Sequence, residues 1–194
     1  NLGYGNHELA DAISDQVKQL SYYHSFSGMS TDLAPVLSEK IIGMFPKSMS
    51  KVFYGGSGSD ANDTNAKIVW FYNNALGRPR KKKIISRFRG YHGVTVLSAG
   101  LTGLKNLHEG FDLPLEMIRH TKAPHRLWEK RVDETDSDFS TRLASELEEL
   151  IIKEDPETVA AFIAEPIQAA GGVIVPPSDY FPKIQKVLDK YDVL

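Results

Sequence analysis

The chain has 194 residues, with 23 lysines and arginines against 25 aspartates and glutamates, and a formal net charge of −2. Hydrophobic residues make up 41% of the chain, so it is not intrinsically disordered and can build one sizeable core. The charge balance lacks the positive excess typical of nucleic-acid-binding proteins. The absence of cysteine excludes disulfides, thiol nucleophiles and thiolate metal sites. No apolar stretch is long enough for a membrane span. From the charge balance and the lack of such a stretch, we expect neither nucleic acid nor a membrane as partner.

The first 50 residues predict two amphipathic helices. Apolar residues recur at spacings of three and four between positions 9 and 20, after Asn6 as a possible N-cap. The same spacing recurs between positions 33 and 44, and Pro46 marks the end of this second helix.

From residue 51 onward, predicted strands alternate with predicted helices, which favours an α/β fold with a mostly parallel sheet. Residues 128–138 are polar and expected to be exposed. The chain lacks an initiator Met, and residues 191–194 look like the entry to a further buried strand, so we expect both ends to be cuts through a larger protein. The elements predicted in chain order are a strand at 52–54, a helix at 61–72, a strand at 84–86, a helix plus loop at 94–110, a strand at 117–120, a helix at 140–154, a strand at 159–164 and a helix at 179–191.

A glycine-rich turn at residues 55–60 joins a predicted strand to a predicted helix. Glycines let the backbone approach an anion, and the helix that follows points its free N–H groups and positive dipole end toward it. Ser57 and Ser59 add hydroxyl donors. The turn lacks the lysine of a P-loop and the G-x-G-x-x-G spacing of dinucleotide-binding folds. Local sequence favours a phosphate-binding turn and an ordinary turn capped by Asp60 about equally.

Two further candidates follow predicted strands. Tyr91 lies between glycines in Gly90-Tyr91-His92-Gly93, where an aromatic ring can lie flat against a planar ligand. Taken by itself, this motif favours an ordinary turn with an aromatic plug. Glu165 follows a continuously apolar strand, at the end of the sheet where ligands bind in open parallel sheets. A solvated acid at a strand end is an equally good interpretation of Glu165.

Other chemistries find little support in the sequence. The six histidines show no metal-ligand spacing, so we expect no zinc site. Gly56-Ser57-Gly58 is one residue short of the nucleophile elbow of serine hydrolases. The basic residues 78–83 precede a predicted strand and lack interleaved aromatic residues, which indicates a solvated edge rather than a nucleic-acid surface.

The order and spacing of the motifs are more informative than any one of them. Residues 54–64, 90–95 and 164–177 together resemble the class III, or omega, aminotransferases, and the resemblance covers essentially the whole chain. It implies fold type I of the pyridoxal-phosphate enzymes, with a mostly parallel sheet, helices on both faces and an incomplete large domain. Residues 1–50 would be an N-terminal helical segment leading into this domain, and residues 51–194 its N-terminal part.

The resemblance also assigns roles to individual residues. Ser57, Gly58 and Ser59 match the turn that binds the phosphate of pyridoxal 5'-phosphate. Tyr91 matches the aromatic residue that stacks on the pyridine ring, with His92 as its neighbour. Glu165 matches the acid near the 3-oxygen of the cofactor and its polar network. The remaining matches, which surround the substrate pocket in relatives, are Tyr22, Tyr23, Phe26, Gln168, Ala169 and Ala170.

The two groups that carry the chemistry in this family have no match in the chain. Transamination needs a lysine that binds the cofactor aldehyde as a Schiff base and an acid that keeps the pyridine nitrogen protonated. The resemblance places both beyond Leu194, and the lysines of the last predicted helix do not match the Schiff-base motif. We therefore expect the 194 residues to be inactive alone and the parent protein to be an enzyme.

The closest subgroup in this resemblance transfers amino groups between amines or omega-amino acids and pyruvate or a similar keto acid. It implies a cytoplasmic homodimer with sites at the subunit interface, whose partners are a small amine donor and a keto-acid acceptor. Two alternatives remain. One is another fold type I enzyme, such as an aminomutase, racemase or decarboxylase. The other is a phosphate-binding module without catalysis, which would use the turn at residues 57–59 and need no aromatic ring at Tyr91.

Overall fold

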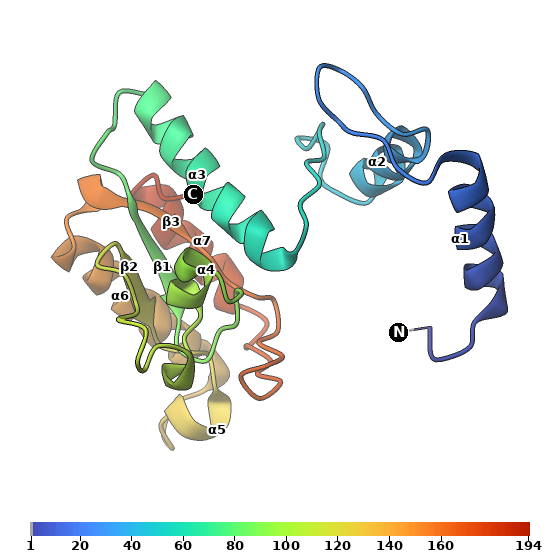
Figure 1. Ribbon diagram of the computed structural model, residues 1–194. Helices are drawn as coiled ribbons and strands as arrows, with labels where there is room; N and C mark the ends of the chain where they lie inside the picture. Colours follow the sequence, from blue (N-terminus) through green and yellow to red (C-terminus); the bar gives the residue numbers. More distant parts are fainter. Residues whose placement is uncertain (1) are drawn as a thin grey trace. The chain divides into compact units, whose positions relative to one another are not determined.

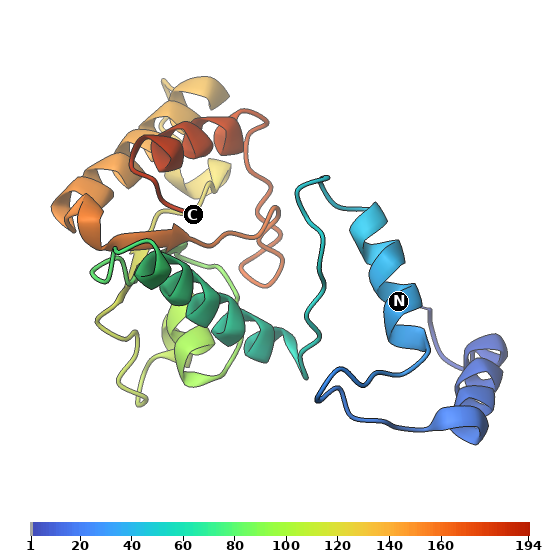
Figure 2. The ribbon, with the colours of Figure 1, turned by 90° about the horizontal axis from the view of Figure 1, so that it is seen from above.

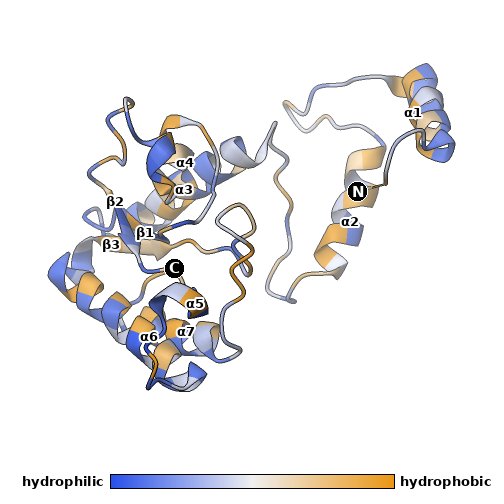
Figure 3. Ribbon diagram, turned by 90° about the horizontal axis from the view of Figure 1, so that it is seen from below, coloured by the Kyte–Doolittle hydropathy of each residue, from blue (hydrophilic) through white to orange (hydrophobic). Residues whose placement is uncertain are grey.

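The computed structural model describes residues 2–194, which divide into two compact units with the boundary between Tyr54 and Gly55. The first unit contains α1 (His7–Leu20) and α2 (Leu33–Gly43), as predicted. Asn6 is the N-cap of α1, because its Oδ1 accepts a hydrogen bond of 2.8 Å from the amide of Leu9. In Figure 3, where the ribbon is coloured by hydropathy, the apolar residues of α1 follow one side of this helix. No helix formed by residues 2–194 has the length and apolarity to cross a membrane.

The predicted strand at residues 52–54 is wrong. These residues form no strand, and the hydroxyl of Tyr54 instead lies 2.9 Å from Oγ of Ser38 on α2. The sequence Val-Phe-Tyr suits a pleated surface, but β-propensity acts through packing and cross-strand neighbours, and none pairs with this segment.

The second unit is built on three parallel strands, β1 (Lys83–Arg87), β2 (Ile118–Thr121) and β3 (Val159–Phe162), in the order β2-β1-β3. Leu194 lies along the other edge of β3, where its amide donates to the carbonyl of Ala160 and its carbonyl accepts from the amide of Phe162. Leu194 therefore bonds to the sheet in the manner of a strand residue, in agreement with the strand entry predicted at residues 191–194.

Helices cover both faces of this sheet (Figures 1 and 2). Successive side chains of a strand point to opposite faces, so Ile84 packs with residues of α3 (Gly58–Ala75) and α4 (Val96–Leu101). Ile85 packs on the opposite face with α6 (Asp136–Lys153) and α7 (Tyr180–Lys190). The predicted α/β fold with a parallel sheet is confirmed. The shorter elements of the second unit are the helical turns η1 (Lys105–Leu107), α5 (Arg126–Glu129) and η2 (Pro156–Thr158).

Two helices begin earlier than the apolar spacing predicted, because their caps lie ahead of their first apolar residues. Ser57 is the N-cap of α3, and its Oγ accepts a hydrogen bond from the amide of Asp60. Thr135 caps α6 through a reciprocal pair with Asp138, so this helix begins within the stretch expected to be exposed and polar.

Candidate functional site

Three segments meet at the end of the second unit where the parallel strands finish. They are the turn after β1, the loop after β3 and the first turn of α3, and Figure 1 shows them at the same end of the sheet. Ligands of open parallel sheets bind at this end. Most of the residues predicted to bind a ligand lie in these segments.

The first turn of α3 presents hydrogen-bond donors on an exposed surface. Oγ of Ser57 accepts from the amide of Asp60 at 3.1 Å, and Oγ of Ser59 accepts from the amide of Val94 at 3.1 Å. Each hydroxyl acts as an acceptor in these bonds, so its own hydrogen stays free to donate. The amides of a first helical turn also have no acceptor within the helix. Asp60 is not the N-cap; its carboxylate reaches back to the amide of Gly56 at 2.9 Å.

The turn that carries Tyr91 is docked directly on the start of α3. Nδ2 of Asn62 donates to the carbonyl of His92 at 2.7 Å. Gly93 has φ 131°, and a Cβ at this position would lie 2.5 Å from Oγ and 2.9 Å from Cα of Ser59. A side chain at position 93 would therefore separate the two segments, and glycine lets the turn that carries the 42% exposed Tyr91 pack against the start of α3.

Glu165 connects the turn after β1 with the loop after β3. Its Oε1 accepts from the amide of Tyr91 at 2.8 Å, and its Oε2 accepts from the amide of Ala169 at 3.3 Å. The buried guanidinium of Arg87 donates from Nη2 to the main-chain carbonyl of Glu165. The carboxylate is therefore a structural bridge as well as a charged group at the site.

The predicted pocket loop is a tight hairpin, residues 168–174. Gln168 and Ile174 exchange two backbone hydrogen bonds of 3.1 Å. The buried side chain of Gln168 donates from Nε2 to the carbonyl of Phe88 at 3.0 Å, so it anchors the hairpin. Ala169 and Ala170 are exposed.

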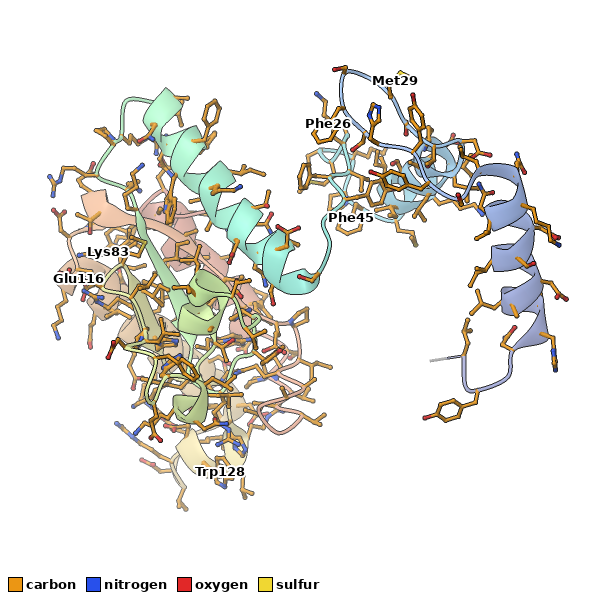
Figure 4. All side chains as sticks on the ribbon, viewed as in Figure 1. Phe26, Met29, Phe45, Lys83, Glu116 and Trp128 are labelled. Atoms are coloured by element: carbon orange, nitrogen blue, oxygen red, sulfur yellow. The ribbon has the colours of Figure 1, made fainter. Side chains whose placement is uncertain are left out.

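The structure thus brings together Ser57, Gly58 and Ser59, the turn of Tyr91 and His92, and the acid Glu165. The other predicted pocket residues, Tyr22, Tyr23 and Phe26, are exposed in the first unit, where Figure 4 labels Phe26. Their part in a pocket stays a prediction.

Sequence reasoning missed several residues that hold the site. Asn62 lies four positions after Gly58, on the same face of α3. This spacing could have predicted that Asn62 lies near the phosphate-binding turn. Thr102 accepts from the amide of His92 at 2.8 Å, and nothing in the sequence marks it. Among residues 2–194 no three potential metal ligands cluster. A cavity of about 540 Å³ is lined in part by Phe88, His108 and His120, and none of the predicted site residues lines it.

His92 is 7% exposed, and its burial lowers the pKa of its imidazole from 6.5 to about 4, against the opposing effect of the nearby Glu165 carboxylate. In the unfolded chain the imidazole of His92 has its ordinary pKa of 6.5. Between the two values the unfolded state binds more protons, so lowering the pH through this window favours unfolding. The ring is therefore neutral near pH 7.

We expect the free energy of unfolding to fall by about 2 kcal/mol between pH 7 and pH 5 through His92. Urea unfolding at the two pH values measures this loss, which His92→Gln should largely remove because glutamine cannot be protonated. The exposed His7 on α1 provides the matched control, His7→Gln. An unchanged pH dependence in His92→Gln would contradict the assignment.

The whole chain, residues 1–194, matches the family model described as aminotransferase class-III. The chain belongs to this family. It therefore has the fold type I of pyridoxal-phosphate enzymes that the sequence predicted, represented here by part of the large domain.

Relatives match the chain along its full length. It is 54% identical to a diaminobutyrate–2-oxoglutarate transaminase of Halomonas elongata and 53% identical to the mitochondrial gamma aminobutyrate transaminase 1 of Solanum lycopersicum. It covers 42% and 38% of these two proteins. A crystal structure of the omega transaminase from Pseudomonas jessenii in complex with PMP superposes with a TM-score of 0.96 at 53% identity, over 100% of this chain and 43% of that one.

Proposed function

We propose that this chain is part of a longer pyridoxal-phosphate-dependent transaminase, which transfers an amino group from an amine or omega-amino acid to pyruvate or a similar keto acid. Family membership and the activities for which the relatives are named support the proposal. The chain spans 38–43% of these relatives, so the activity is that of the longer protein. The observation that carries it is one surface that joins the donors of α3 to Tyr91 through the contact between Ser59 and Val94.

The residues of this surface fit pyridoxal phosphate. A phosphate is an anion that needs several donors, and the hydroxyls of Ser57 and Ser59 each retain a hydrogen for this purpose. The free amides and positive dipole end of α3 add to these donors. The exposed ring of Tyr91 suits contact with a planar pyridine.

When bound, the cofactor supplies an aldehyde and an electron-accepting pyridine ring. Ser57, Gly58 and Ser59 would hold the phosphate, and Tyr91 would pack against the pyridine ring. Glu165 accepts a hydrogen bond from the amide of Tyr91 and so fixes the position of the Tyr91 ring. His92 stays neutral near pH 7 and adds no charge beside the cofactor.

The substrate would bind beside the hairpin 168–174. Ala169 and Ala170 are small and exposed, so they leave room for an amine. The lysine and the aspartate that the reaction requires would lie beyond Leu194.

The organisation of the longer protein follows the same proposal. Residues 1–50 would lead into the large domain and residues 51–194 would form its N-terminal part. The subgroup implies a cytoplasmic homodimer, which size-exclusion chromatography with light scattering and cell fractionation would test.

An assay of the full-length protein tests the function. With pyridoxal phosphate, pyruvate and a panel of primary amines and omega-amino acids, we expect alanine to form together with an equal amount of ketone or aldehyde. Release of carbon dioxide, inversion of the donor or migration of its amino group, without alanine, would identify another fold type I enzyme. Phosphate binding without turnover of any donor would favour the non-catalytic module.

A further inference from the structure

We propose that Trp128 is a positioning residue for the hairpin 168–174. It holds the side chain of Arg89, Arg89 holds the hairpin, and the hairpin sets the shape of the pocket at Ala169 and Ala170. The part of this inference that concerns the pocket rests on the proposed transaminase function.

The first step is the contact between Arg89 and the hairpin. Nε of Arg89 donates to the carbonyl of Gly171 at 2.7 Å. A Cβ at Gly171 would lie 2.1 Å from the carbonyl oxygen and 3.0 Å from the carbonyl carbon of Arg89. The two backbones therefore touch without an intervening side chain, and a displacement of Arg89 moves the hairpin.

The hairpin needs such support because its own backbone is strained. Val173 has φ 54°, a conformation that β-branched residues rarely adopt, and its side chain is 68% exposed. No burial of this side chain compensates the strain. Backbone of this kind persists where surrounding contacts over-determine it. Besides the bonds of Gln168 to Phe88 and of Ala169 to Glu165, these contacts come from Arg89 and from α5.

The second step is the contact between Arg89 and α5. Cζ of Arg89 lies 4.5 Å from the centroid of the Trp128 ring, within the range of a cation–π interaction. The ring of His125 stacks on Trp128 at 4.0 Å with an interplanar angle of 2°. Nη1 of Arg126 donates to the carbonyl of Val175 at 2.9 Å. The four-residue helix α5 therefore contacts both Arg89 and the segment that follows the hairpin.

Trp128 differs from the core residues in its exposure to solvent. It is 61% exposed, and Figure 4 labels it on α5. Removing an exposed side chain leaves no core cavity. A large exposed aromatic ring that stacks on both His125 and Arg89 is instead suited to fixing the direction of the arginine.

Hydrogen exchange of the full-length protein tests the positioning. In Trp128→Ala we expect the amides of Gln168, Gly172, Val173 and Ile174 to exchange about twofold to fivefold faster, the range expected from loss of an exposed cation–π contact. Trp128→Phe keeps a ring and should restore most of the protection. Leu127 is the matched control, because it is 82% exposed on the same helix, and Leu127→Ala should change nothing. Unchanged hairpin exchange in Trp128→Ala overturns the inference whatever the activity.

Steady-state kinetics tests the consequence for the pocket. In Trp128→Ala the ratio of kcat/KM for a bulky amine to kcat/KM for a small amine should change about twofold to fivefold, with unchanged affinity for pyridoxal phosphate. Faster hairpin exchange with an unchanged ratio overturns the role in the pocket. A wild-type protein that transaminates no donor overturns the proposed function instead, and the exchange measurement still decides whether Trp128 positions the hairpin.

Discussion

Replacing Gly103 by alanine should lower the free energy of unfolding by about 3 kcal/mol. A Cβ at this position would lie 2.2 Å from the carbonyl oxygen of Arg87, 2.7 Å from Cα of Phe88 and 2.8 Å from the amide of Arg89. All three atoms belong to the backbone, so no side-chain rotation relieves the overlap. The midpoint of urea unfolding of the full-length protein, with and without the substitution, measures the loss.

The same substitution should also disturb the turn of Tyr91. Gly103 donates to the carbonyl of Gly90 at 2.8 Å and accepts from the amide of Arg89 at 2.8 Å, so it pairs directly with the residues that precede Tyr91. Gly43 of α2 is the matched control, because no described atom outside its chain neighbours and the adjacent turns of its own helix lies within 4 Å of the position of its Cβ. Gly43→Ala should leave stability unchanged or raise it by up to about 1 kcal/mol. Equal midpoints for Gly103→Ala and the wild type would show that the backbone can move away.

Replacing Tyr91 by alanine should weaken the binding of pyridoxal phosphate by about tenfold or more. An aromatic pair contributes about 0.5–1.5 kcal/mol beyond the apolar area that it buries. The substitution removes this ring contact but keeps the amide that donates to Glu165, so the turn itself should persist. Titration of the full-length apoprotein with pyridoxal phosphate measures the dissociation constant.

Two further variants make the result specific. Tyr91→Phe keeps the ring and should bind the cofactor within a few-fold of the wild type. Tyr72 has a similar exposure, 44% against 42% for Tyr91, and lies near the far end of α3, so Tyr72→Ala should not change the affinity. A phosphate-binding module without a role for the aromatic ring would bind equally well after Tyr91→Ala, and that outcome would contradict the proposed site.

The sequence predicted the layers of the second unit because the pattern of a buried parallel sheet is local. Ile84 and Ile85 pack on opposite faces, as expected for a strand covered by helices on both sides. The glycine-rich turn and the motif around Tyr91 were also visible as local sequence. Helix starts were less accurate, since Ser57 and Thr135 cap their helices ahead of the first apolar residues.

The contacts between distant segments could not be predicted. Glu165 meets the amide of Tyr91 across 74 residues, and Arg89 meets the ring of Trp128 from a different element. The spacing of residues along the chain does not indicate either contact, because each depends on the conformation of the loops that follow the strands. Trp128 lies in a stretch whose polarity indicated only exposure. It is exposed, and its ring also contacts the guanidinium of Arg89.

The bridge formed by Glu165 makes one side chain a spacer between two loops. One of its carboxylate oxygens holds the turn of Tyr91 and the other holds Ala169. An aspartate, which is one methylene shorter, could keep both bonds only by drawing the two loops together. Evolution or engineering of this protein therefore cannot adjust the place of the ring and the width of the neighbouring pocket independently at position 165, because any change there alters both at once.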